Sequence, residues 1–99
     1  MIVKIFDKAS WQIDNGMSEK VVISHFEFIF EWLNEHDMLS PDGLEILETG
    51  IDEDVSLHEG LVNETGLHFL NEFYDKLITD SGYDVAREKV LIEKLFANE

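Results

Sequence analysis

Residues 19–37 read EKVVISHFEFIFEWLNEHD, and their apolar pattern is the strongest in the chain. Five side chains recur at the spacing of one helix face: Val22, Phe26, Ile29, Phe30 and Leu33. Three more widen this stripe: Ile23, Phe28 and Trp32. The stretch predicts a long helix that begins after Ser18 as its N-cap. A helix this apolar is either central in a bundle or presents an exposed aromatic face to a partner.

An internal pattern follows this helix. LSPDGLEIL (residues 39–47) and VNETGLHFL (residues 62–70) both place an N-capping residue, Ser40 or Asn63, before a helix. Both also place a glycine, Gly43 or Gly66, at the third helical position. Glycine is a poor helix former, so its use twice predicts that another backbone approaches closely at each helix start.

The remaining segments complete the predicted fold. Helices are expected over residues 41–49, 64–79 and 84–97, with an ordered connection over 51–62 that is pinned by Val55, Leu57 and Leu61. Residues 2–14 favour a helix, although residues 1–6 can also pair as a strand. The sequence therefore predicts one all-α domain over residues 1–99: a compact bundle of four to five helices, with room for a short N-terminal strand.

Charge is distributed unevenly along the chain. The formal net charge is −15, and no Lys or Arg occurs between Lys20 and Lys76. A central field of one sign repels nucleic acids and anionic membranes and attracts basic proteins or cations. Direct binding to nucleic acid or to a membrane is therefore not expected.

Cysteine is absent, which excludes disulfides, thiol catalysis and thiolate metal sites. The first residues are charged too early for a secretory signal peptide, and the apolar runs are too short to span a bilayer. These features predict a soluble cytoplasmic protein.

No catalytic or metal-binding motif stands out. His68 and Glu72 lie four residues apart, with Asp75 a turn later, but no second element of this kind accompanies them. Asp52-Glu53-Asp54 matches only part of a calcium-binding loop. His25 is expected to be a hydrogen-bonded structural group, and Glu88 and Glu93 are available for local pairing in the last helix. We predict no catalytic residue, metal ligand or cofactor.

The leading hypothesis is a non-enzymatic interaction module that binds a basic partner protein through its acidic central face. The partner could be a nuclease or a nucleic-acid-binding protein, which would make this chain an inhibitor: an immunity protein, an antitoxin or a nucleic-acid mimic. The analogy rests on size and charge. The candidate binding residues are six acids and two aromatic anchors: Glu45, Glu48, Asp52, Glu53, Asp54, Glu59, Phe28 and Trp32.

Two alternatives remain open. The first is a soluble helical structural domain without an acidic recognition role, in which residues 22–33 bury their aromatic side in a homodimer or larger homo-oligomer. The second is a metal-binding helical protein that uses His68 and its neighbours.

Overall fold

The computed structural model describes residues 4–97 and confirms the prediction of an all-α domain with a short N-terminal strand, which pairs in a two-stranded antiparallel sheet. The elements in chain order are β1 (Ile5–Lys8), α1 (Ala9–Asp14), α2 (Glu19–Glu35), α3 (Pro41–Thr49), β2 (Ser56–His58), the 3₁₀ helix η1 (Glu59–Leu61), α4 (Glu64–Ser81) and α5 (Val85–Ala97). The predicted helices thus end within two residues of the observed ones from α2 onward. Ser18 occupies the N-cap position of α2, but its side chain makes no capping hydrogen bond.

The N-terminal segment differs from the prediction of a single helix over residues 2–14. β1 pairs antiparallel with β2, and Ile5 lies opposite His58 while Asp7 lies opposite Leu57. Helical structure begins only at Ala9. The short apolar pattern of this segment fits both the helical and the strand periodicity. Pairing with β2, about 50 residues further along the chain, decides for the strand. Residues 1–3 of this prediction lie outside the described residues.

The connection over residues 51–62 also contains more structure than expected, because it holds both β2 and η1. Its three predicted anchors are confirmed, since Val55, Leu57 and Leu61 are all buried. Strand pairing of this kind is a long-range contact, so the local sequence pattern did not reveal it.

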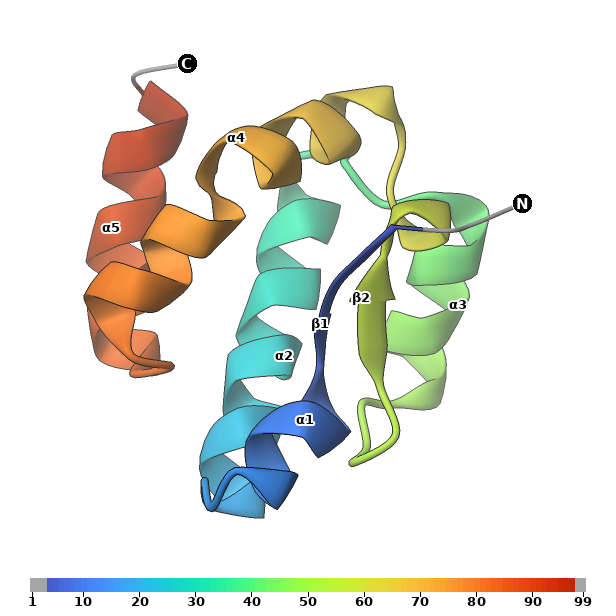
Figure 1. The fold of residues 1–99 in the computed structure, drawn as a ribbon. Helices are drawn as coiled ribbons and strands as arrows, with labels where there is room; N and C mark the ends of the chain where they lie inside the picture. Colours follow the sequence, from blue (N-terminus) through green and yellow to red (C-terminus); the bar gives the residue numbers. More distant parts are fainter. Residues whose placement is uncertain (1–3, 98–99) are drawn as a thin grey trace.

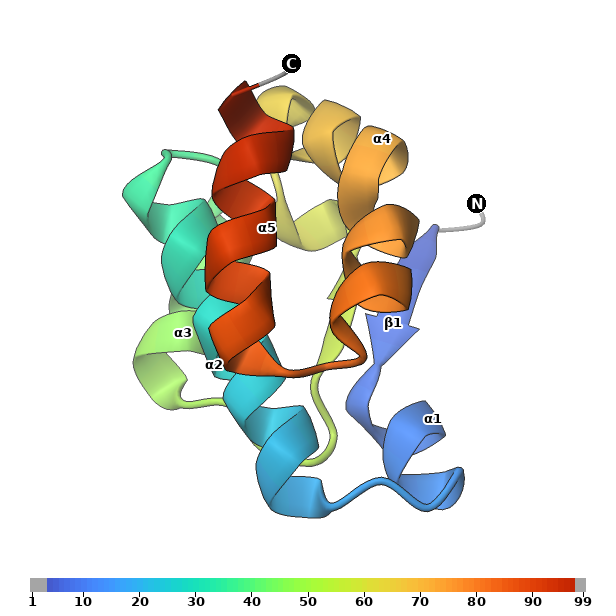
Figure 2. The same ribbon diagram turned by 90° about the vertical axis from the view of Figure 1, so that its left-hand side faces the viewer.

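The elements surround α2. α4 and α5 form an antiparallel helical hairpin on one side of α2, and α3 lies on its other side (Figure 1). The view turned by 90° shows α5 in front of α2, with β1 and α1 at the right, beside α4 (Figure 2). Gly82 ends α4 in the left-handed conformation, with φ of 60°, and so allows the tight turn into α5.

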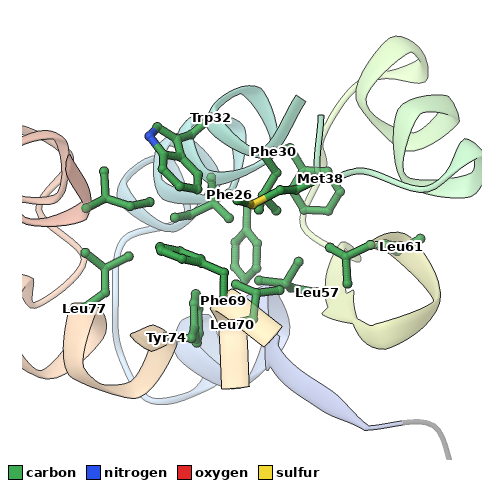
Figure 3. Packing of buried hydrophobic residues seen from close by; sticks show 14 of the residues in the cluster. Phe26, Phe30, Trp32, Met38, Leu57, Leu61, Phe69, Leu70, Tyr74 and Leu77 are labelled. Carbon is green, nitrogen blue, oxygen red and sulfur yellow. The ribbon is translucent and has the colours of Figure 1, made fainter. Parts of the chain in front are cut away.

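The core confirms the interpretation of α2 as the central helix. Phe26, Phe30 and Leu33 are fully buried, and they pack with side chains from α4 and from β2 in one cluster (Figure 3). Trp32 is only 4% exposed and Phe30 is fully buried, so the other interpretation, an exposed aromatic face on this helix, does not hold. Each fully buried aliphatic or aromatic side chain contributes about 1.5–3 kcal/mol through the hydrophobic effect.

The two repeated helix starts pair with each other. The backbone N–H of Ser40 donates to the carbonyl of Leu61 at 3.0 Å, and the N–H of Asn63 donates to the carbonyl of Met38 at 2.9 Å. Each capping side chain also accepts from the glycine of its own helix, as predicted. The internal pattern therefore marks two segments that form an isolated antiparallel bridge.

The glycines explain why the two segments fit. A Cβ atom on Gly43 would lie 2.1 Å from the carbonyl oxygen of Leu61, and one on Gly66 would lie 2.7 Å from the carbonyl oxygen of Met38. Real Cβ atoms essentially never approach other atoms so closely. The predicted close approach of a second backbone is thus confirmed at both helix starts.

We expect Gly43→Ala and Gly66→Ala to lower the free energy of unfolding by about 1–3 kcal/mol, with the larger loss at Gly43. Without the clash, alanine inside a helix would raise stability by about 0.5–1 kcal/mol, so the sign itself is diagnostic. Urea denaturation measures the effect. Thr65→Ala, at an exposed position beside Gly66, is the control and should change stability by less than about 0.5 kcal/mol. Stabilisation by either glycine replacement would contradict the close approach.

Candidate functional site

A concave surface lies between α3 and the segment that leads into β2. It is a depression of about 490 Å³, which we call the acidic depression. Its rim carries four carboxylates and its floor is apolar: Asp42, Glu45, Asp52 and Asp54 line it together with Ile46, Val55 and Leu61. α3 supplies one wall because its helical spacing places Asp42, Glu45 and Ile46 on the same side.

The negative charge extends beyond this rim. The neighbouring carboxylate of Glu19, at the start of α2, raises the pKa of Glu53 above its ordinary value, and Asp54 and Asp52 raise it further. These acids repel one another, so protonating Glu53 relieves the repulsion. Glu19 was not among the predicted binding residues, because it lies more than 30 residues before Asp52 and meets it only in the folded chain.

Within residues 4–97, no Lys or Arg forms an ion pair with these carboxylates. The Lys and Arg ion pairs of the described chain are Lys76 with Asp80 and Arg87 with Asp84, and both lie on or beside the α4–α5 hairpin. The carboxylates of the acidic depression therefore face solvent without a salt-bridge partner from the described residues.

The predicted binding residues separate into two places. Glu45, Asp52 and Asp54 come together in the acidic depression, and Glu53 lies beside it. Glu48 is exposed on α3 but does not line the depression. The Glu59 side chain accepts a hydrogen bond from the backbone N–H of Lys4 at 3.2 Å and thus helps to hold the N-terminal strand.

The two aromatic candidates lie elsewhere. Phe28 and Trp32 line a separate depression of about 300 Å³ between α2 and α5. The Trp32 indole N–H donates to a carboxylate oxygen of Glu93 at 3.0 Å. Because Trp32 is buried and hydrogen-bonded to α5, it does not extend the acidic depression as an anchor.

A second constellation went unrecognised in the sequence. We call it the buried network, and it consists of Asp7, His25, Tyr74, Tyr83 and Glu88. Both carboxylates and the imidazole are 0–1% exposed. His25 Nδ1 lies 2.6 Å from Glu88 Oε2, and His25 Nε2 lies 2.9 Å from the Tyr74 hydroxyl.

Asp7 completes the buried network from β1. Its Oδ2 accepts from the hydroxyls of Tyr74 and Tyr83 at 2.8 and 2.7 Å. Its Oδ1 accepts from the backbone N–H of Lys8 at 2.8 Å and from Gln12 Nε2 at 3.0 Å. Four donors thus satisfy this buried carboxylate without a cation.

The prediction for His25 is confirmed, since both ring nitrogens have partners. Glu88 instead is fully buried against His25, so it is not available for local pairing on α5. One sequence signal could have revealed this: Glu88 falls on the helical stripe of Val85, Ile92 and Leu95, where a charged side chain points inward.

Tyr74 and Tyr83 are weaker acids than an exposed tyrosine. Burial raises the pKa of Tyr74 well above its ordinary range, and the Asp7 carboxylate raises it further. Burial also raises the pKa of Tyr83, followed by its hydrogen bond to Asp7. A phenol with a raised pKa is a weaker acid, so neither group is tuned for proton donation near neutral pH.

Among residues 4–97, no three His, Asp or Glu side chains come together in a way that could hold a metal ion. Within the same part of the chain, no helix combines the length and apolar character needed to cross a membrane.

Comparisons of the chain with family models, with curated proteins and with solved structures give no match. A function for this protein is therefore inferred from its own residues and their geometry.

Alkaline titration tests the buried network, because Tyr74 and Tyr83 are the only two tyrosines in the chain. Their folded pKa values lie above the unfolded value of 10.0, so their stabilising contribution is complete below that pH and is lost as the pH rises further. We expect no phenolate absorbance until the protein unfolds, and then a cooperative rise. Protein unfolded in urea is the control and should titrate near pH 10.0. A gradual rise around that pH in folded protein would contradict the burial of these hydroxyls.

Glu53→Gln should raise the free energy of unfolding at neutral pH. The pKa of Glu53 is raised above its ordinary 4.5, so protonation stabilises the folded state at low pH and this gain is lost as the pH rises. Glutamine removes the repulsion at every pH. Urea denaturation at low salt should show the gain, and added salt should shrink it. Glu72→Gln, one helical turn before Lys76, is the control and should give no gain. Equal effects of the two variants would contradict the repulsion around Glu53.

Proposed function

We propose that this protein is a non-enzymatic interaction module that binds a basic partner protein through the acidic depression. The observation that carries the proposal is a concave surface with an apolar floor and a carboxylate rim, without a salt bridge to any Lys or Arg in residues 4–97. The partner surface complementary to it presents Arg or Lys side chains.

The shape of the depression suits a long basic side chain. Arg and Lys combine an apolar stem with a charged head, so the stem can lie on Ile46 and Val55 while the head reaches the rim. A guanidinium group has the additional advantage of bidentate hydrogen bonds to a carboxylate. Insertion of one arginine would thus use both the floor and the rim.

Electrostatics support the same partner class. The acids around Glu53 repel one another in the free protein, and an approaching cation relieves that repulsion. A field of this sign accelerates association with a basic protein and disfavours nucleic acids and anionic membranes. In its narrower form, the partner is a nuclease or nucleic-acid-binding protein, and this chain inhibits it by occupying its cationic site.

The two predicted aromatic anchors, Phe28 and Trp32, do not belong to this binding face, because they line the separate depression between α2 and α5. Apolar contact with the partner is assigned instead to the floor of the acidic depression. A dimer through the aromatic side of α2 receives little support, since Phe26, Phe30 and Trp32 are already buried within the chain. The absence of cysteine fits a reducing compartment such as the cytoplasm.

Neutralising three acids should weaken binding. We expect the triple variant Asp52→Asn, Glu53→Gln, Asp54→Asn to bind an arginine-rich peptide about tenfold more weakly, because each exposed charge contributes modestly and three are removed together. Titration calorimetry at low and at moderate salt measures this, and added salt should reduce the difference. The wild type and the same variant are also used as bait for lysate of the native source. We expect the wild type, and not the variant, to capture a single basic protein.

The matched control is Glu27→Gln, Glu31→Gln, Glu72→Gln, which removes the same charge from exposed positions on α2 and α4. If both triple variants lost affinity equally, binding would depend on net charge and not on the acidic depression. If neither lost affinity, the proposed function would be wrong.

A further inference from the structure

The buried network joins five separate parts of the chain. Asp7 comes from β1, His25 from α2, Tyr74 from α4, Tyr83 from the connection after α4, and Glu88 from α5. Tyr83 reaches Asp7 from a backbone with φ of 66°, a conformation that non-glycine residues seldom adopt. The network therefore holds the N-terminal strand and the C-terminal helix to the middle of the molecule.

The hydrogen bonds fix how many protons the network contains. The single hydroxyl proton of Tyr74 is donated to Asp7, so the proton between Tyr74 and His25 must come from Nε2 of the ring. Nδ1 faces both oxygens of Glu88, at 2.6 and 2.8 Å. Two acceptors without a proton between them do not approach to 2.6 Å, so this contact also contains one proton. The two contacts of the His25 ring therefore hold two protons.

The surroundings of His25 support this assignment. Two carboxylates, Asp7 on β1 and Glu88 on α5, are the charged groups of the network itself. Its other titratable members, Tyr74 and Tyr83, are neutral. Beyond the network, Asp75 lines a surface depression beside Asp7 and both tyrosines, and Lys20 lines another beside Tyr83. No described Lys or Arg forms an ion pair with either buried carboxylate: Glu88 contacts His25, and Asp7 is satisfied by neutral hydrogen-bond donors.

We propose that the buried network is a proton-linked latch, in which four protons occupy four hydrogen-bonded contacts and bind α5 and β1 to the core. Removing one proton leaves two acceptors facing each other across one contact. Adding one leaves a donor without an acceptor, or neutralises a carboxylate. Either change disrupts a buried contact, so the stability of the fold depends on keeping this proton count.

The sign of the pH dependence follows from the unfolded chain. Between about pH 4.5 and 6.5, the same five side chains hold four protons when unfolded, because histidine is charged and both carboxylates are ionised. The latch therefore adds no pH dependence in this window. Above about pH 6.5 the unfolded histidine loses its proton while the folded latch keeps four, so stability falls as the pH rises. Below about pH 4.5 the unfolded carboxylates gain protons, so stability also falls there.

Glu88→Gln tests the latch with little change in shape. The glutamine N–H₂ can donate to Nδ1, which leaves a neutral ring that still donates from Nε2 to Tyr74. All contacts then keep a hydrogen, but the folded state holds one titratable proton fewer. The ratio of the wild-type to the variant folding equilibrium constant should therefore fall about tenfold for each pH unit between about pH 5 and 8. Urea denaturation of both proteins across that range measures the ratio.

Glu93→Gln, also on α5 and exposed, is the matched control and should give a profile parallel to the wild type. Parallel profiles for wild type and Glu88→Gln would overturn the proposal. If Glu88→Gln does not fold, nitrogen NMR of wild-type protein with labelled histidine decides. We expect one hydrogen on Nε2 and a second hydrogen in the contact between Nδ1 and Glu88. A contact between Nδ1 and Glu88 that contains no hydrogen would overturn the proposal.

Discussion

The contact between His25 and Glu88 organises the interior of this protein. Both side chains are fully buried, so each would be strongly destabilising without the other. Removing one member of such a pair typically costs about 3–5 kcal/mol, because a charge is left uncompensated in the core. The ring nitrogen on the far side of His25 continues the interaction through Tyr74 to Asp7. A single set of polar contacts therefore specifies how β1, α2, α4 and α5 meet, which apolar packing alone would define less uniquely.

The same chain carries a second, opposite use of carboxylates. Inside, Asp7 and Glu88 are matched with donors; outside, the acids of the acidic depression form no salt bridge with a Lys or Arg of the described residues. Surface repulsion around Glu53 lowers the stability of the folded state, and the buried core offsets it. Natural proteins retain destabilising surface features of this kind where they serve binding. The proposed function assigns that role to the acids beside α3.

The paired helix starts connect the scaffold to this surface. Gly43 lets the start of α3 lie directly against the backbone of Leu61, and Leu61 in turn forms part of the floor of the acidic depression. The opposite pairing, of Gly66 with Met38, fixes α4 in the same bridge. Backbone hydrogen bonds thus hold the α3 wall of the depression, with Asp42 and Glu45, against the floor at Leu61.

The sequence by itself determined the features that depend on neighbouring residues. Local pattern predicts the helix positions from α2 onward, the capping roles of Ser40 and Asn63, and the close backbone approach at two glycines. Composition alone shows that the middle of the chain is acidic. Only the tertiary structure decided the rest. It paired β1 with β2, set the two helix starts against each other, placed His25 against Glu88 and separated Trp32 from the acidic depression. Each of these depends on contacts between residues far apart in the chain, where the environment of a side chain is set by its partners and not by its neighbours in sequence.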